Sequence, residues 1–549
     1  MPQDTSDMDA LGVLDNLVAN TAYLNAQQTD RSELRKRRSS LILPKPKNLR
    51  SQDAPEKLFE LLCERQPIGK RLFQQFLSSV PLYLAASRFL EELIDWHYAE
   101  DQSKNYVQKR IINKFCLTSS RNFLSFLTGD AAEALESLSE DNFENLIPTI
   151  KDATTEFLKG KPFSEYLESP FYYKFLQWKE FEKEPITNKY FYEFRILGKG
   201  GFGEVCAVQA KYSGQMYACK KLHKRCLKKK GGERLALLEK QILDKVNSPF
   251  IVNLAYAFET ETHLCLVMDL MIGGDLKFHI YDLGARGLQM DRVVYYSAQI
   301  VCGILHLHSL DIIYRDMKPD NVLLDGKGQC CLSDLGLAVE LPKGKTMCQK
   351  AGTTGYMAPE ILKQDYYRTS VDWWALGCTV YEMVAARLPF KDFREKVQNS
   401  EVNRRTLEDA PKFEHKNFNE PTKDIITRFL KKKMDYRLGC SRNGDDPRKH
   451  AFFKDINFHR LEVGLVEPPW VPKSNLVYAK DMVEFKDISE EEDVALDAKD
   501  QKFFKEFSTG AVPIRWQREM IESGVFDELN CFQINGHSLA SKSRTCVIT

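Results

Sequence analysis

Apolar residues recur at helical spacing through the first third of the chain. Between residues 55 and 176, Leu72 and Phe76 are four positions apart, as are Leu90 and Ile94. This spacing places side chains on one face of a helix. No group of residues with catalytic chemistry accompanies the pattern. It predicts a helical bundle with its aromatic side chains in the core.

A different pattern begins near Tyr190. The short runs Phe194–Leu197, Val205–Val208 and Met216–Lys220 are β-like in composition and are separated by turns. From there to about residue 455 the segments are mostly helical in pattern. This order predicts a small sheet lobe followed by a larger helical lobe.

The ends of the chain differ from these two regions. Residues 1–30 begin with aspartates among apolar residues at helical spacing, which indicates either a frayed terminus or a docking helix that orders on a partner. Residues 31–54 are basic, and indicate a linker that is either a solvated arm or attracted to anionic lipid headgroups. Another helical segment is expected at 499–530, after an acidic patch at 490–493.

Composition sets broad limits. With 549 residues the chain is too long for one ordinary domain, and 43% hydrophobic and 28% charged residues are typical of globular proteins. The net charge of +1 favours no nucleic-acid partner. The 14 cysteines include no C-x-x-C pair, so reduced thiols are expected. We expect neither a signal peptide nor a membrane span, since no apolar run reaches about 18 residues.

The stretch 314–321, with the Asp334 that follows it, contains the groups that phosphoryl transfer requires. The carboxylate of Asp316 would accept the proton of an attacking hydroxyl, and Lys318 would stabilise the transferring phosphoryl group. Asn321 and Asp334 would hold Mg2+ through oxygen atoms. The pattern resembles the catalytic and metal-binding loops of protein kinases.

A glycine-rich run precedes this stretch. The sequence 198–205 fits G-x-G-x-x-G-x-V, in which backbone N–H groups can approach phosphate oxygens without a Cβ in the way. Dinucleotide-binding folds use a similar run, but here a strand follows instead of a helix, and Lys220 ends the next β-like run. These features resemble the ATP site of a kinase. The residues assigned to this loop are Leu197, Gly198, Lys199, Gly200, Gly201, Phe202, Gly203, Glu204 and Val205.

Three more residues extend the resemblance to the rest of the nucleotide site. Glu239 lies on the helix expected after Lys220 and would pair with that lysine. Met268 would stand behind the adenine, and Asp275 would contact the ribose. Further matches to the protein kinase large lobe are Ala358-Pro-Glu360, Asp372, expected to hold the catalytic-loop backbone, and Arg437, expected to pair with Glu360.

Two residues that differ from the general protein kinase pattern indicate which group of kinases this chain resembles. Tyr314 replaces a histidine, as in the AGC group, and Leu335 gives Asp-Leu-Gly in place of Asp-Phe-Gly. Together with the sequence 352–360, these features resemble the G-protein-coupled receptor kinases. Within that family, the C-a-a-X box at Cys546–Thr549 indicates the visual branch. The resemblance implies an α+β multidomain protein. It would have a bilobal AGC protein kinase fold inserted into an all-α bundle similar to the regulators of G-protein signalling.

The same resemblance implies a division of the chain. The expected parts are a receptor-docking helix (1–30), a basic linker (31–54), the first part of the bundle (55–176), the kinase domain (190–455), the AGC C-terminal extension with the return to the bundle (456–521) and a C-terminal tail (522–549). The sequence Phe504-Lys-Glu-Phe507 is similar to an AGC hydrophobic motif. Because the family returns to its bundle here, we predict that these two phenylalanines pack in the bundle core.

One residue of the activation segment is unusual. AGC kinases carry a phosphorylatable threonine three residues before the first glycine of Gly352-Thr-Thr-Gly, and this chain has Gln349 there. A contact between an activation-loop phosphate and arginines is therefore not available. The resemblance implies that a docked N-terminal helix closes the lobes instead.

Three sites of covalent modification are predicted. Cys546-Val-Ile-Thr549 is a C-a-a-X box, which predicts prenylation of Cys546, although one lipid alone gives only marginal membrane binding. Ser40 follows Arg37 and Arg38, as in sites of basophilic kinases, and a phosphate there would cancel part of the positive patch. Ser489, beside the acidic patch, is a candidate for autophosphorylation.

These observations predict a Ser/Thr protein kinase that uses ATP and Mg2+. The resemblance implies that it phosphorylates activated G-protein-coupled receptors, light-activated (cone) opsins above all, at the cytoplasmic face of photoreceptor membranes, and so leads to arrestin binding. One alternative is a general AGC kinase for soluble substrates. Another is a scaffold that binds G proteins through its helical domain.

Overall fold

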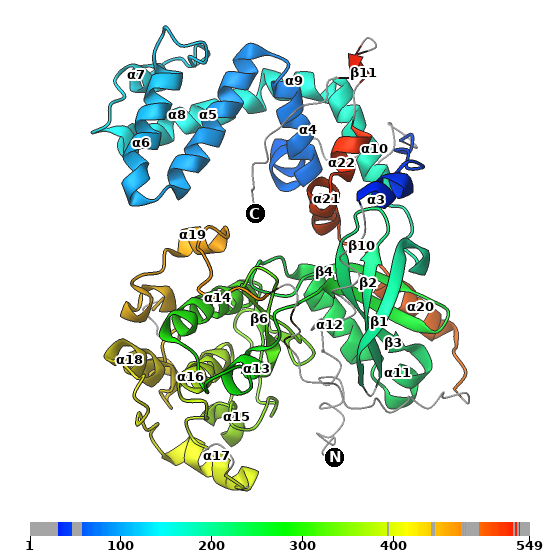
Figure 1. Ribbon diagram of the computed structural model, residues 1–549, viewed down its shortest axis with the longest axis vertical. Helices are drawn as coiled ribbons and strands as arrows, with labels where there is room; N and C mark the ends of the chain where they lie inside the picture. Colours follow the sequence, from blue (N-terminus) through cyan, green and yellow to red (C-terminus); the bar gives the residue numbers. More distant parts are fainter. Residues whose placement is uncertain are drawn as a thin grey trace. The chain divides into compact units, whose positions relative to one another are not determined.

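A computed structural model of the chain describes residues 31–46, 58–200, 202–391, 395–440, 445–473, 476, 478, 494–530, 533–534 and 537–538. The chain forms two compact units (Figure 1). One contains residues 186–512, and the other contains residues 36–185 together with 513–545. The first unit therefore interrupts the second in sequence, as an inserted domain does.

The small lobe of the first unit is built on one antiparallel sheet. Its strand order is β1-β2-β3-β5-β4-β10. Strand β2 pairs with β1 on one side and with β3 on the other. A Cβ at position 203 would lie 1.8 Å from the carbonyl oxygen of Lys221, so the approach of these strands requires Gly203. The strands are β1 (Phe191–Gly200), β2 (Gly203–Ala210), β3 (Met216–His223), β4 (Leu254–Glu259), β5 (His263–Asp269) and β10 (Gly510–Ala511).

The large lobe is organised around helix α16 (Ser370–Ala385). Every residue of this helix from Ser370 to Val384 is buried, because α14 (Met290–Ser309) and α18 (Glu420–Phe429) pack against it. Its Trp373 stacks on Phe429 with ring centroids 5.9 Å apart. The other helices of this unit are α11 (Lys224–Lys230), α12 (Glu233–Lys245), α13 (Leu276–Tyr281), α15 (Pro359–Lys363), α17 (Asn399–Glu408), α19 (Phe458–Glu462) and α20 (Ala498–Phe507). Its short strands are β6 (Ile312–Ile313), β7 (Val322–Leu324), β8 (Cys330–Leu332) and β9 (Val339–Glu340).

The second unit is helical, and its core joins the two separate segments of the chain. Trp178 packs against Trp516 and Phe526 with ring centroids 5.9 and 5.7 Å apart, and its Nε1 donates to Oδ1 of Asn530 at 3.1 Å. Its α-helices are α4 (Pro67–Leu77), α5 (Pro81–Tyr98), α6 (Asp101–Ile111), α7 (Asp130–Glu136), α8 (Phe143–Lys159), α9 (Lys161–Leu167), α10 (Pro170–Glu182), α21 (Pro513–Glu522) and α22 (Val525–Leu529). It also has π-helices at Glu60–Arg65 and Ile112–Cys116, and a strand pair β11 (Gln533–Ile534) and β12 (His537–Ser538).

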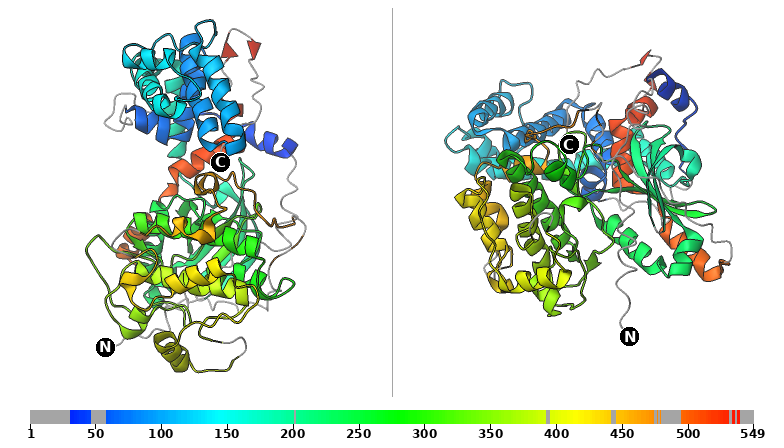
Figure 2. Two further views of the ribbon diagram at one scale, coloured as in Figure 1. Left: turned by 90° about the vertical axis from the view of Figure 1, so that its left-hand side faces the viewer. Right: turned by 60° about the horizontal axis from the view of Figure 1, so that its bottom comes forward.

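The prediction for Phe504 and Phe507 is wrong. Helix α20 belongs to the kinase unit, where it contacts α12 and β4, and Figures 1 and 2 both show it beside the small-lobe sheet. The two side chains are 1% and 0% exposed, and Nζ of Lys224 lies 4.5 Å from the ring centroid of Phe504. Two phenylalanines three positions apart mark an apolar helix face but do not say which core accepts it. Among the described residues of this region, those from Pro513 to Asn530 return to the bundle.

The described part of the basic linker, residues 31–46, contains a helix and a buried contact. Arg31–Arg38 forms helix α3, and the side chain of Arg38 is only 8% exposed. Its Nη1 lies 2.8 Å from Oε1 of Glu528, and its Nη2 donates to the carbonyl oxygen of Ser523 at 3.1 Å. An arginine-rich run can thus supply a buried contact as well as a solvated surface.

Some of the predicted features fall on residues that the structure does not describe. The proposed docking helix at 1–30, Gly201, Ser489 and Cys546 lie outside the described residues. Among the helices of the described residues, none is both long and apolar enough to cross a membrane.

Candidate active site

Lys220 and Glu239 form a buried ion pair in the small lobe. Lys220 lies on β3, Glu239 lies on α12, and Nζ is 3.0 Å from Oε1. The side chains are 1% and 4% exposed. Two charges that are withdrawn from water to this degree depend on each other, because either one alone would be left without compensation.

The described glycines of the glycine-rich run lie where β1 and β2 pair. Gly198 pairs with Val205, and Gly200 pairs with Gly203, so the backbone doubles back over a few residues. Leu197 and Val205 on either side are buried. The hairpin holds backbone N–H groups where no Cβ would block an anion.

Two further residues of the predicted nucleotide site lie on neighbouring elements. Met268 is 4% exposed on β5 and pairs with Ala218 of β3. Asp275 caps helix α13, because its carboxylate accepts the backbone N–H of Phe278 at 2.7 Å. The cap gives Asp275 a fixed orientation at the start of the large lobe.

The carboxylate of Asp316 is held by three donors. Nζ of Lys318 donates to Oδ2 at 2.7 Å, and Nδ2 of Asn321 donates to the same oxygen at 2.8 Å. The hydroxyl of Thr353 donates to Oδ1 at 2.6 Å and accepts from Lys318 at 2.9 Å. The sequence prediction included Lys318 and Asn321 but missed Thr353. Its position in Gly-Thr-Thr-Gly is the only sequence signal that could have suggested a role.

The side chain of Asp372 fixes the backbone of the catalytic loop. Its Oδ2 accepts the N–H of Tyr314 at 3.0 Å, and its Oδ1 accepts the N–H of Arg315 at 2.8 Å, which confirms the predicted role. Nε2 of His308 lies 2.8 Å from Oδ2. Arg315 has a φ of 68°, a left-handed conformation that surrounding contacts must impose on a non-glycine residue.

Asn321 and Asp334 are brought together by the strands β7 and β8. Ser333, which precedes Asp334, donates its N–H to the carbonyl oxygen of Asn321 at 2.8 Å. Because Nδ2 of Asn321 faces Asp316, the amide oxygen of Asn321 is left for a cation. An amide oxygen and a carboxylate are donors suited to a hard divalent cation, so these residues fit such an ion.

Comparisons with known proteins agree with this geometry. Residues 191–448 match the protein kinase domain, and residues 58–175 match the regulator of G protein signaling domain. Rhodopsin kinase grk7a of Danio rerio is 62% identical over 95% of both chains. Rhodopsin kinase GRK7 of Homo sapiens is 54% identical over 98% of this chain and 99% of its own.

The chain belongs to the rhodopsin kinases, the visual branch of the G-protein-coupled receptor kinases. It is a Ser/Thr protein kinase with a bilobal kinase fold and a helical domain, and it uses ATP and a divalent cation. The buried pair between Arg437 and Glu360 confirms the predicted large-lobe anchor.

Two of the predicted phosphorylation and lipid sites lie outside the described residues, as noted above, and Ser40 lies within them. Ser40 is exposed, and its hydroxyl donates to the carbonyl oxygen of Arg37 at 3.4 Å. The sequence did not predict the contact between Nη1 of Arg315 and Oε1 of Gln349, which are 3.1 Å apart.

Proposed function

We propose that the kinase transfers the γ-phosphoryl group of ATP, with Mg2+, to serine and threonine hydroxyls of light-activated opsin. The observation that carries this proposal is the carboxylate of Asp316, oriented by Lys318, Asn321 and Thr353, in a chain whose relatives are named rhodopsin kinases. The phosphorylated receptor would then bind arrestin and stop signalling.

Each polar residue has a separate role in this proposal. Asp316 orients the substrate hydroxyl and accepts its proton, and Lys318 stabilises the charge of the transferring group. Asn321 and Asp334 hold Mg2+, which when bound neutralises phosphate charge. Lys220, positioned by Glu239, binds the α- and β-phosphates beneath the glycine-rich hairpin. Met268 and Asp275 place the adenine and the ribose.

The decisive experiment compares opsin membranes in light and in darkness. Phosphate incorporation should be far greater in light, and Asp316→Asn should abolish it while ATP binding is largely retained, because the asparagine keeps the size of the side chain but cannot accept the proton. Phosphorylation of bleached opsin by Asp316→Asn at the wild-type rate would falsify the role of Asp316. Equal incorporation in light and darkness would favour a general AGC kinase for soluble substrates.

Receptor docking and membrane attachment are part of the same proposal. Residues 1–30 would dock on the activated receptor, and a prenyl group on Cys546 would keep the kinase at photoreceptor membranes. Deletion of residues 1–20 should reduce phosphorylation of opsin more than that of a soluble peptide. Cys546→Ser should shift the protein from the membrane pellet to the supernatant, and unchanged sedimentation would contradict the lipid anchor.

Phosphorylation of the kinase itself would add regulation. A basophilic kinase would modify Ser40, and the kinase would modify its own Ser489. Mass spectrometry after incubation with ATP alone, and with a basophilic kinase, should find phosphate on these two serines. Its absence from Ser489 in the first sample, or from Ser40 in the second, would remove that site from the proposal.

A further inference from the structure

Arg315 is a buried cation whose described hydrogen-bond acceptors are all neutral. The residue is 9% exposed. Its Nε donates to the carbonyl oxygen of Leu337 at 2.7 Å, and its Nη1 donates to Oε1 of Gln349 at 3.1 Å. Nη1 also lies 4.0 Å from Sδ of Met347. Withdrawal of a guanidinium from water is costly unless its N–H groups are bound, so each of these acceptors contributes to keeping the side chain in place.

The side chain of Arg315 joins three segments of the site. Arg315 directly precedes Asp316, Leu337 follows the Asp334-Leu-Gly sequence, and Gln349 belongs to the activation segment. A change in the position of the guanidinium would therefore move the segments on both sides of the transfer site. The left-handed φ of 68° at Arg315 makes the loop dependent on such outside contacts.

Gln349 is itself fixed in position by the large lobe. The hydroxyl of Tyr367 donates to its backbone carbonyl oxygen at 2.7 Å. Two residues earlier, Met347 and Tyr367 exchange backbone hydrogen bonds of 3.2 and 2.8 Å. Tyr367 is 1% exposed, so it provides a rigid support. The amide of Gln349 is thus presented to Arg315 by an anchored backbone, although the residue as a whole is exposed.

We propose that Gln349 is a positioning residue for phosphoryl transfer. Its amide oxygen holds Arg315, and through Arg315 it holds Asp316 and Leu337 in the arrangement that transfers phosphate, with no phosphate on the activation segment. The inference rests on the proposed role of Asp316 and adds a residue to it. Because the acceptor is neutral, the contact is weaker than one with an anion, and a negative charge at position 349 should strengthen it.

The test uses full-length variants and both a soluble serine peptide and bleached opsin. Gln349→Ala should lower kcat about tenfold on both substrates, since a lost hydrogen bond to a charged donor has roughly that effect. KM for ATP should not change, because the pair of Lys220 and Glu239 is untouched. Gln349→Glu should match or exceed the wild-type kcat. Lys350→Ala, an exposed neighbour in the same segment, is the matched control and should equal wild type.

Three results would overturn the inference: a Gln349→Ala enzyme with wild-type kcat, a Gln349→Glu enzyme as slow as Gln349→Ala, or a rise in KM for ATP as the main effect. A double-mutant cycle gives a further check, because Gln349→Ala should add nothing in an Arg315→Ala background if it acts through that arginine. A thermal transition for each variant identifies loss of folding, and Gln349→Glu keeps the test open if Gln349→Ala is unstable. Failure of the proposed function would look different: Asp316→Asn would stay active, or dark and bleached opsin would be modified equally.

Discussion

Two buried arginines of the kinase unit hold their charge in different ways. Arg437 is fully buried, and its Nη1 and Nη2 donate to the two carboxylate oxygens of Glu360 at 2.5 and 2.9 Å. Arg315 is nearly as buried, but it faces the amide of Gln349 and a carbonyl oxygen. The first charge is neutralised by its partner, whereas the second is only solvated by dipoles.

The difference follows from what each arginine joins. Arg437 connects the A-P-E sequence to the large lobe, and its Nη1 also donates to the carbonyl oxygen of Ser370 at 2.9 Å. A bidentate pair that is removed from water suits a permanent connection. Arg315 directly precedes Asp316. Its partner, the amide of Gln349, is neutral, so a negative charge on the partner would strengthen the contact. Substitutions at these pairs should therefore differ in size and in kind.

The largest effect is expected from Arg437→Met. It leaves the carboxylate of Glu360 buried and unpaired, which should lower the free energy of unfolding of the kinase unit by about 3–5 kcal/mol. The unfolding transition to follow is the one that ATP with Mg2+ shifts upward. Arg404→Met is the control: Arg404 pairs with Glu401 and Glu408 on the surface of α17, and its loss should leave the transition almost unchanged. Equal effects of the two substitutions would contradict the importance of burial.

Glu360→Gln should have a smaller effect, because it converts the Arg437 pair into one that resembles the Arg315 pair. The amide keeps an acceptor for Arg437 but removes the negative charge, so we expect a loss of roughly 1.5–3 kcal/mol in the same transition. A loss as large as that of Arg437→Met would mean that the charge, and not the hydrogen bonds, carries the whole interaction. Glu420→Gln, at an exposed pair with Lys423, provides the surface control.

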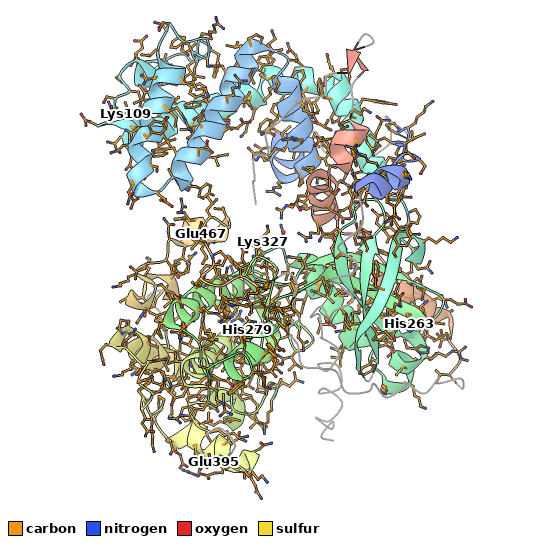
Figure 3. All side chains as sticks on the ribbon, viewed as in Figure 1. Lys109, His263, His279, Lys327, Glu395 and Glu467 are labelled. Carbon is orange, nitrogen blue, oxygen red and sulfur yellow. The ribbon has the colours of Figure 1, made fainter. Side chains whose placement is uncertain are left out.

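The smallest effect is a dependence of stability on pH, and it comes from His279, which contacts a third arginine. Nη2 of Arg292 lies 2.9 Å from Nδ1 of His279, whose Nε2 lies 2.6 Å from the carbonyl oxygen of Gly273, so the imidazole must be neutral to accept from the arginine. Trp470 and Tyr478 pack against the ring, and Figure 3 shows His279 among the large-lobe helices. Burial above all, and then the charge of Arg292, lowers the pKa of His279 to about 4.

A lowered pKa means that the unfolded chain binds the proton more readily than the folded one. The stability that neutral His279 provides is therefore complete above pH 6.5 and is lost as the pH falls towards 4. Between pH 7 and pH 5 this amounts to at most about 2 kcal/mol. His279→Gln should flatten the pH dependence of the ATP-sensitive transition, and His459→Gln at an exposed site should not. The burial-lowered pKa of His263, about 4, adds a slope of the same sign that remains in both variants.

Much of the active site could be predicted because its chemistry requires particular residue types at short spacing. Asp316, Lys318 and Asn321 lie within six residues of one another, and the structure places them in direct contact. The pairing of Lys220 with Glu239 could be expected from the strand and helix that carry them. The strands predicted at 194–197 and 205–208 correspond to the centres of longer ones, and the strand predicted at 216–220 is the first part of β3.

Contacts between residues that are far apart in sequence could not be predicted from local spacing. Thr353 is 37 residues from the carboxylate it binds, and it has no sequence feature that separates it from Thr354. Phe504 and Phe507 were assigned to the wrong core because helical periodicity identifies an apolar face but not its partner. Neither a solvated arm nor a lipid-binding run, the two alternatives for the basic residues before Ser40, predicts that Arg38 binds Glu528, 490 residues away in sequence.

The sequence alone thus predicted the cluster of Asp316, Lys318 and Asn321 and the order of the two lobes, because local spacing and residue type carry that information. The resemblance to AGC kinases also placed Gln349 where those kinases usually carry a phosphorylatable threonine. Only the tertiary structure decided what Gln349 contacts. The amide of Gln349 meets Arg315 because Tyr367 anchors the activation segment and Asp372 fixes the catalytic loop. Hydrogen bonds between segments that are tens of residues apart depend on how the chain packs, and no local pattern records them.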